Sequence, residues 1–239
     1  MKVQYKPATI IHIIDETPIV KRFFFKMNSD EKFVFKPGQF VMLDLPIESK
    51  ITNRSYSIAS APGDDNIFEL IIVLNPDGLG TPFMWQNFKV GDVVPVAGPL
   101  GKFVLPEGKI THDICFIATG TGIAPLRSML HHIINHNLAE ANLYLIFGNR
   151  TYQDILYKIE MEALSSKFPF FSFIPVLSRP EESWQGRRGY VHQVYEEIFS
   201  DKREASFYLC GWKNMIMEAR DRLQQMGYQK QQIKFELYD

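Results

Sequence analysis

The sequence contains only two cysteines among 239 residues, Cys115 and Cys210, and both stand in apolar runs. A disulfide framework is therefore not expected, and two thiolates are too few for a Cys-ligated iron–sulfur cluster. The chain also lacks any run of the roughly 18 apolar residues that a membrane span needs. Its first ten residues lack the apolar core of a signal peptide. We therefore expect a cytoplasmic protein without a membrane span.

An excess of charge of one sign is missing as well, because 26 Lys and Arg residues stand against 27 Asp and Glu residues. Without a basic field, nucleic acid is not an expected partner. His131, His132 and His136 lie close together in the sequence, but no Cys or carboxylate completes a known ligand spacing. We therefore expect no metal site. The length favours two domains of ordinary size, and the 46% hydrophobic content is typical of a globular protein.

Residues 1–108 contain short segments rich in β-branched and aromatic residues, separated by turn residues such as Pro37-Gly38. These segments recur at intervals of roughly ten residues without a convincing long helix. The pattern predicts an antiparallel barrel.

Residues 109–239 instead alternate strand and helix patterns. We expect five strands and helices around residues 154–164 and 214–227. An earlier helix is expected from an apolar stripe made of Leu126, Met129, Leu130, Ile133 and Ile134. Gly227 stands where the last of these helices should end. Unbroken apolar strands between helices predict a parallel sheet covered on both faces, and ligands of such sheets bind at the carboxyl ends of the strands.

The segment Asn53–Ser60 combines a fixed cation, an aromatic ring and a small hydroxyl within four residues. Arg54 can bind a phosphate through two hydrogen bonds. Tyr56 can stack on the isoalloxazine ring of a flavin, and Ser57 can form a hydrogen bond near the ring nitrogen that takes a hydride. Taken alone, the segment fits a plain strand that carries a surface arginine better than it fits a flavin site, and it becomes specific only together with the motifs that follow it.

A glycine-rich loop at residues 75–82 precedes a short helical segment that we expect to begin at Thr81. Glycines allow close approach of a ligand, and the amides of a helix start favour an anion. The alternative is a hairpin loop followed by an ordinary helix N-cap.

Residues 118–125, Ala-Thr-Gly-Thr-Gly-Ile-Ala-Pro, join the first strand of the second domain to its first helix. Two glycines and a helix N-terminus can accept a pyrophosphate. The spacing differs from the usual dinucleotide fingerprint, so this turn is only moderately specific by itself.

Arginines follow several of the later strands: Arg150, Arg179, and either Arg187 or Arg188. If the strands are parallel, these residues share one edge of the sheet, where they can bind an adenosine 2′-phosphate. Considered singly, each is also consistent with a solvated loop arginine.

Cys210 and the C-terminal Glu236 and Tyr238 complete the candidates. Cys210 could border a nicotinamide pocket or could be a buried small hydrophobe. Tyr238 could cover the second face of the flavin or could be a surface tyrosine on a terminal strand.

Taken in order, these motifs closely resemble the ferredoxin–NADP reductase family, and the bacterial ferredoxin/flavodoxin–NADP reductases in particular. The resemblance covers nearly the whole chain. It rests on Arg-Ser-Tyr-Ser (54–57), Gly-Leu-Gly-Thr (78–81), Gly-Thr-Gly-Ile-Ala-Pro (120–125), Ser-Arg (178–179), Cys-Gly-x-x-x-Met (210–215) and Glu-x-Tyr (236–238). It implies a six-stranded antiparallel barrel that binds FAD and a five-stranded parallel sheet that binds NADP(H).

The resemblance also implies roles for individual residues. Those expected to contact a cofactor are Arg54, Ser55, Tyr56, Ser57, Ile71, Ile72, Val73, Gly78, Leu79, Gly80, Thr81, Gly120, Thr121, Gly122, Pro125, Arg150, Ser178, Arg179, Arg187, Gly211, Met215 and Tyr238. Those expected to act in catalysis are Ser57, Cys210, Glu236 and Tyr238. Thr121 would lie between flavin and nicotinamide, and Glu236 would relay a proton or tune the reduced flavin.

The expected reaction is hydride transfer from NADPH to flavin N5, followed by release of single electrons to ferredoxin or flavodoxin. Because such carriers are acidic, basic residues near the flavin are expected, with Lys21, Arg22, Lys36 and Lys50 as candidates. The alternatives are the reductase component of an oxygenase system, which segment 180–186 also resembles, and a non-catalytic regulatory subunit. Asp239 stands where several bacterial family members have a terminal Trp.

Overall fold

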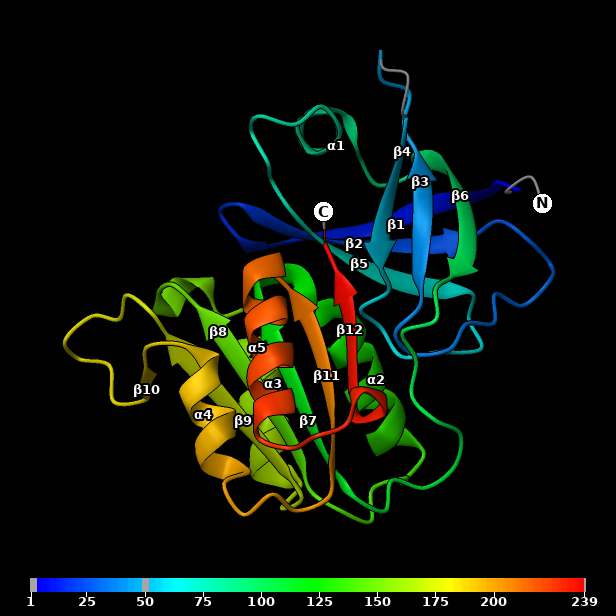
Figure 1. Cartoon of the computed structure of the whole chain (residues 1–239). Coiled ribbons are helices and arrows are strands. Elements are labelled where there is room, and N and C mark those ends of the chain that lie inside the picture. Colours follow the sequence, from blue (N-terminus) through cyan, green and yellow to red (C-terminus); the bar gives the residue numbers. More distant parts are fainter. Residues whose placement is uncertain (1–3, 49–51, 239) are drawn as a thin grey trace. The chain divides into compact units, whose positions relative to one another are not determined.

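The computed structural model (Figure 1) describes residues 4–48 and 52–238, so Lys50 and Asp239 lie outside the described residues. The chain divides into two compact units. The first comprises the residues up to Leu105 together with Arg127–His132, and the second comprises Pro106–Leu126 and the residues from Ile133 onward. The proposed boundary between residues 108 and 109 stays a prediction.

The described part of the first unit contains one six-stranded sheet in the order β4-β3-β6-β1-β2-β5. Its paired strands run antiparallel. Past the end of β4, Ile58 forms an antiparallel bridge with Leu70 of β5, which joins the two edge strands and curls the sheet into a barrel. The elements are β1 (Lys6–Thr17), β2 (Val20–Met27), β3 (Phe40–Asp44), β4 (Asn53–Ser57), β5 (Ile67–Val73), α1 (Gly80–Asn87) and β6 (Val93–Leu100). The predicted antiparallel barrel is confirmed.

Alternation of side chains along the strands builds the barrel core. Phe23, Phe25, Phe68 and Leu70 are at most 1% exposed and pack in one cluster. The Phe25 and Phe68 rings stack at 5.3 Å between centroids. Since successive residues of a strand point to opposite faces, the residues between them face away from this core.

The second unit is built on a parallel sheet whose described strands follow the order β10-β9-β8-β7-β11-β12. It contains six strands, so the expectation of five was wrong. The elements are β7 (Asp113–Thr119), η1 (Gly120–Gly122), α2 (Ile123–Asn135), β8 (Leu143–Asn149), η2 (Tyr152–Asp154), α3 (Lys158–Lys167), β9 (Phe171–Leu177), β10 (Arg187–Arg188), α4 (Val191–Ile198), β11 (Ala205–Gly211), α5 (Lys213–Gln225), η3 (Lys230–Gln232) and β12 (Ile233–Leu237).

The sixth strand and a fourth helix account for the difference from the sequence prediction. β10 consists of two exposed arginines and therefore has no apolar pattern. α4 is only eight residues long, but its Val191, Val194 and Tyr195 are buried and follow helical spacing. Helix α3 begins at Lys158, later than predicted, because residues 152–154 form a separate 3₁₀ turn. As predicted, α5 ends just before Gly227, which has a φ of +107°.

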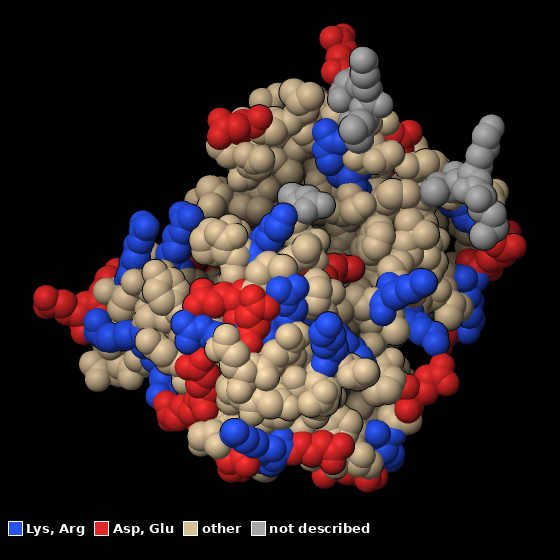
Figure 2. Space-filling model, viewed as in Figure 1, with Lys and Arg blue, Asp and Glu red and all other residues tan. Residues whose placement is uncertain are grey.

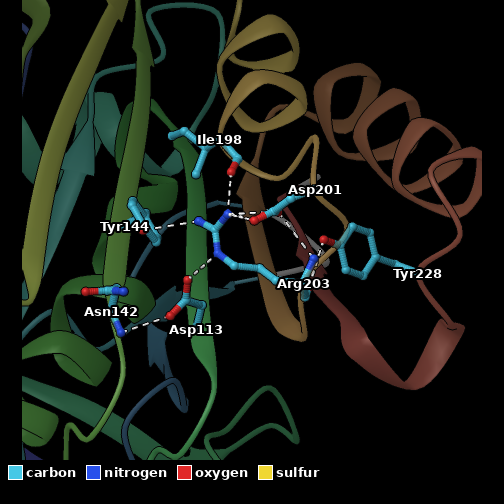
Figure 3. Close-up of polar contacts among 7 residues, drawn as sticks. All are labelled: Asp113, Asn142, Tyr144, Ile198, Asp201, Arg203 and Tyr228. Carbon is cyan, nitrogen blue, oxygen red and sulfur yellow. Dashed lines mark hydrogen bonds and ion pairs between the residues drawn. The ribbon is translucent and has the colours of Figure 1, made fainter.

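A network around Arg203 ties together the amino-terminal edge of this sheet (Figure 3). The Arg203 Nε atom donates to Asp113 at 2.8 Å, and its Nη1 atom donates to the carbonyl of Ile198 at 2.6 Å. Arg203 also pairs with Asp201 and donates to the Tyr144 hydroxyl. These groups brace the edge at which the strands begin. The opposite, carboxyl edge carries the candidate ligand-binding residues.

Candidate functional site

The Arg-Ser-Tyr-Ser motif forms most of β4, which pairs with β3. Ser57 is buried at 5% exposure, whereas Ser55 is exposed. Tyr56 packs partly against the barrel core, and its hydroxyl donates to the Met84 sulfur of α1 at 3.6 Å. Burial raises the pKa of Tyr56 to about 12. The phenol therefore stays neutral and is held in place at neutral pH.

The structure brings Arg54 together with the glycine-rich loop. A Cβ atom added to Gly80 would stand 3.0 Å from the Arg54 Nε atom and 3.2 Å from its Cγ atom. The guanidinium group therefore lies against the first residue of α1. No described side chain caps this helix, and no acidic residue stands in its first turn. A cation and a helix N-terminus side by side form a binding site suited to a phosphate.

The loop before α1 is stabilised by Thr81. The Thr81 Oγ1 atom accepts a hydrogen bond from the Asn75 amide at 2.8 Å and donates to the Asn75 carbonyl at 3.2 Å. Thr81 is the second residue of α1, and Leu79 rather than Thr81 is the N-cap. The expectation that the helix begins at Thr81 was therefore wrong by one residue. Gly78 lies half-buried in this loop, and Leu79 is 60% exposed.

The three residues expected to line the flavin ring lie on both faces of β5. Ile72 belongs to the barrel core, so Ile71 and Val73 point to the other face. Ile71 is buried and Val73 is 39% exposed. Ile71 and Val73 share a face with each other but not with Ile72.

A buried ion-pair network in the first unit was missed by the sequence analysis. Glu69 of β5 is 2% exposed and accepts hydrogen bonds from Arg22 at 2.5 Å and from Arg127 at 3.1 Å. Arg127 also donates to the Ala59 carbonyl at 2.8 Å, and the Ala59 amide donates to the Glu69 carbonyl at 2.8 Å. The network thus fixes the backbone two residues beyond Ser57. Glu69 could have been noticed as a lone carboxylate in an apolar strand.

The basic residues proposed for carrier docking differ in their surroundings. The Arg22 side chain is only 19% exposed and pairs with Glu69, so it does not belong to an exposed patch. Lys21 pairs with Asp15 at 2.6 Å. Lys36 is exposed. On the face shown in Figure 2, Lys and Arg side chains are interspersed with Asp and Glu side chains.

In the second unit, the Gly-Thr-Gly turn forms η1 and leads directly into α2. Gly120 has a φ of +52°, and apart from its chain neighbours no described atom lies within 4 Å of where its Cβ would stand. Gly122 is different, because its Cβ would stand 2.4 Å from the Cys210 carbonyl oxygen. Gly120 therefore leaves room for a ligand, whereas Gly122 is required by packing.

This turn lies where the order of the parallel strands reverses. From β7 the chain proceeds outward through β8 and β9, and it returns to the other side of β7 with β11. The carboxyl ends of β7 and β11 therefore flank the switch point, the usual ligand site of such sheets. Thr119, which the sequence analysis missed, links the two ends, because its Oγ1 atom accepts a hydrogen bond from the Trp212 amide at 2.9 Å.

Three of the four proposed catalytic residues lie together at this edge. Cys210 pairs in register with Glu236 of β12. Burial raises the pKa of the Cys210 thiol well above its usual range, Glu236 raises it further, and a hydrogen bond with Tyr238 opposes the shift. The thiol is therefore neutral at physiological pH. The fourth residue, Ser57, belongs to the first unit.

The proposed adenosine-binding residues follow the carboxyl ends of β8 and β9. The Arg179 amide donates to the Arg150 carbonyl at 2.8 Å, which joins the two loops, and both arginines are exposed. Ser178 is half-buried and donates to the Asn149 carbonyl through its amide at 3.0 Å. Arg187 lies in β10 and is exposed. The expectation that these residues share one edge agrees with the parallel pairing of β8, β9 and β10.

The remaining candidates differ in exposure. Thr121 is half-buried in η1. Pro125 is buried in the first turn of α2, where its missing amide proton costs no hydrogen bond. Met215 packs in the core of the second unit, and Gly211 lies against Thr119.

The residues present fit the two nucleotide cofactors. In the first unit, Arg54 beside an uncapped helix start suits the phosphates of a flavin nucleotide, and Tyr56 supplies a fixed ring. In the second unit, open space at Gly120 beside the start of α2 suits a pyrophosphate. Among residues 4–48 and 52–238, none of the helices has the length and apolar character of a membrane span.

Comparison with known proteins gives the same class for both units. Residues 7–105 match the family "Oxidoreductase FAD-binding domain", and residues 116–221 match "Oxidoreductase NAD-binding domain". The protein is thus a flavoprotein oxidoreductase that binds FAD and a nicotinamide nucleotide. The chain is 32% identical over 239 residues to "Ferredoxin--NADP reductase B" of Sorangium cellulosum, and the match covers 97% of each chain. It belongs to the ferredoxin–NADP reductase family.

Several of the other relatives are longer than this chain. It is 32% identical over 222 residues to "Glycine betaine monooxygenase reductase subunit" of Chromohalobacter salexigens, covering 91% of this chain but 60% of that protein. Among solved structures, the cytochrome P450 reductase GcoB of Amycolatopsis is 26% identical with a TM-score of 0.88, over 98% of this chain and 70% of that one. A ferredoxin NADP+ reductase from Neisseria gonorrhoeae shares the fold over 99% of both chains, with 24% identity and a TM-score of 0.83.

Proposed function

We propose that this protein, an NAD(P)H-dependent flavoprotein reductase, takes electrons from NADPH and passes them one at a time to a small carrier protein, ferredoxin or flavodoxin. The observation that carries this proposal is the match to "Ferredoxin--NADP reductase B" over 97% of both chains. The exposed Arg150, Arg179 and Arg187 support NADPH, because guanidinium groups bind a phosphate in a bidentate manner. The absence of a disulfide at the two buried cysteines supports a cytoplasmic location.

The chemistry that a bound flavin would supply is acceptance of a hydride from a reduced nicotinamide and release of single electrons. The residues of this chain would bind and orient the two cofactors and would keep water away from the reacting rings. Arg54 and the start of α1 would hold the flavin phosphates, and Tyr56, fixed by its hydrogen bond to Met84, would orient the ring. The buried Ser57 would offer its hydroxyl to the flavin near the nitrogen that takes the hydride. The rate of hydride transfer depends on how precisely these residues position the two rings.

In the second unit we propose that the neutral Cys210 thiol provides a small, soft wall for the nicotinamide. Glu236, its neighbour in register, holds a proton or tunes the charge at this edge. Tyr238, which forms a hydrogen bond with Cys210, would cover the place of the nicotinamide and would have to move aside when that ring binds. Tyr238→Ala should therefore tighten nicotinamide binding, and an unchanged affinity would contradict this role.

The second candidate is the reductase component of an oxygenase system. The relatives named "Glycine betaine monooxygenase reductase subunit" and "Toluate 1,2-dioxygenase electron transfer component" favour it. The chain covers only 60% and 61% of those proteins. Here the acceptor would be a separate protein of that oxygenase system.

The deciding experiment is an anaerobic titration of the flavin-loaded protein with NADPH and, separately, with NADH. Bleaching of the flavin spectrum at much lower NADPH than NADH supports the first proposal. Equal bleaching, or a preference for NADH, favours the oxygenase component, and no bleaching by either favours a non-catalytic regulatory subunit. Reduction of cytochrome c that requires added ferredoxin and falls with salt tests the carrier.

A further inference from the structure

The loop between β9 and β10 is held in shape by Arg188 and Trp184. The Arg188 Nη2 atom donates to the carbonyls of Glu181, Glu182 and Trp184 at 2.9–3.1 Å. The Trp184 Nε1 atom donates to the Arg187 carbonyl at 3.0 Å. Arg188 therefore stabilises the loop. Of the two adjacent arginines, Arg187 is the candidate for binding a ligand.

The Arg187 side chain forms an ion pair with Glu197 of α4. Its Nη1 and Nη2 atoms donate to Glu197 Oε2 and Oε1, both at 2.7 Å, which is a bidentate geometry. The hydrogen bonds lower the pKa of Glu197 and raise that of Arg187, so both groups are ionised at neutral pH. Their side chains are 49% and 59% exposed, so a dissolved ligand can reach the pair.

A phosphate monoester binds a guanidinium group through the same two parallel hydrogen bonds that Glu197 accepts. Arg187 cannot make both bidentate pairs at once with the same two nitrogen atoms. We propose that Glu197 is a specificity-determining residue that competes with the adenosine 2′-phosphate for Arg187 and so limits the preference for NADPH over NADH. This inference rests on the proposed function, in which Arg187 reads that phosphate.

The size of the effect follows from the exposure of the pair. Exposed ion pairs are weak and are screened by salt. Removing the competing carboxylate should therefore tighten binding of a 2′-phosphorylated ligand by about two- to fivefold and no more. A ligand without the phosphate should not respond.

The test measures binding of adenosine 2′,5′-bisphosphate and of adenosine 5′-monophosphate, which differ only in the 2′-phosphate. The full-length protein is compared with Glu197→Gln, Arg187→Gln, the double variant and Glu196→Gln. Glu196 is the matched control, because it is the adjacent residue, loses the same charge and pairs with Arg222 instead, at 2.9 Å. Thermal melting verifies that each variant is folded.

We expect Glu197→Gln to bind the bisphosphate about two- to fivefold more tightly and the monophosphate unchanged, with no such gain in Glu196→Gln. In the Arg187→Gln background, Glu197→Gln should have no further effect. A weaker or unchanged affinity in Glu197→Gln overturns the inference, and so does an equal gain in Glu196→Gln. The proposed function is judged separately, by the loss of 2′-phosphate discrimination in Arg187→Gln. If neither the wild type nor Glu197→Gln discriminates, both proposals fail.

Discussion

Gly211 lies so close to Thr119 that a Cβ atom on Gly211 would stand 2.3 Å from the Thr119 Oγ1 atom. Gly211 also has a φ of +128°, a conformation that other residues rarely adopt. These two residues end β11 and β7, the strands that flank the switch point. The backbone contact between them sets the shape of the proposed nicotinamide site.

Gly211→Ala should therefore damage both stability and nucleotide binding. The new methyl group meets backbone and a threonine side chain that is itself hydrogen-bonded to Trp212, so the strand ends have to separate. Gly227→Ala is the matched control, because Gly227 has a φ of +107° but no described atom within 4 Å of its added Cβ. The control should cost about 1–2 kcal/mol from backbone strain alone, and Gly211→Ala about 1–3 kcal/mol more. Equal melting temperatures for the two variants would contradict the steric argument.

Arg54→Ala should weaken FAD binding by roughly 10- to 100-fold, because a charge-assisted hydrogen bond to a phosphate contributes about 1.5–3 kcal/mol. The FAD affinity of Arg54→Lys should lie between those of the wild type and Arg54→Ala, since an ammonium group keeps the charge but loses the bidentate geometry. Fluorescence titration of the flavin-free protein with FAD measures both. Lys89→Ala, which removes an exposed cation just beyond the far end of α1, should leave the affinity unchanged.

Much of this arrangement could be predicted from the sequence. The strands are visible in the sequence as apolar runs, and α2 and α5 are visible as apolar residues at helical spacing. Arg54 and Gly80 belong to recognisable motifs. β10 could not be found, because two exposed arginines carry no periodicity. The network of Glu69 could not be found either, since Arg22 and Arg127 are 47 and 58 residues away from it in sequence. The Arg187–Glu197 ion pair likewise depends on tertiary packing.

Glu69→Ala should destabilise the first unit strongly. It leaves the guanidinium groups of Arg22 and Arg127 without their shared buried carboxylate, and breaking a buried ion pair from one side costs about 3–5 kcal/mol. Denaturant unfolding of the flavin-free protein measures this cost. Glu31→Ala removes the exposed partner of Lys6 and should change the midpoint little. Comparable losses in the two variants would show that the Glu69 network contributes no special stability.

Cys210 and Cys115 should both be unreactive in the folded protein. Burial raises the pKa of each thiol well above its usual value, and only a thiolate attacks a disulfide reagent. At pH 8 an aromatic disulfide reagent should therefore titrate neither thiol until denaturant is added, after which both should react. Rapid reaction in the native protein, lost in Cys210→Ala, would show that Cys210 is accessible as a thiolate.

His192 should make the second unit less stable in mild acid. It is 7% exposed, and its Nδ1 atom lies 3.0 Å from the Tyr195 hydroxyl. Burial lowers the pKa of His192 from 6.5, and the nearby Arg222 lowers it further, whereas Glu218 and Glu196 oppose this shift. Below pH 6.5 the unfolded chain therefore binds a proton that the folded protein does not.

The contribution of the neutral His192 to the free energy of unfolding is thus fully present above pH 6.5. It is lost as the pH falls from 6.5 toward the lower pKa that His192 has in the folded protein. The check is a series of unfolding midpoints between pH 5 and pH 8. His192→Gln, which cannot take up the proton, should flatten this part of the curve. If His192→Gln keeps the wild-type slope, the acid sensitivity arises elsewhere in the molecule.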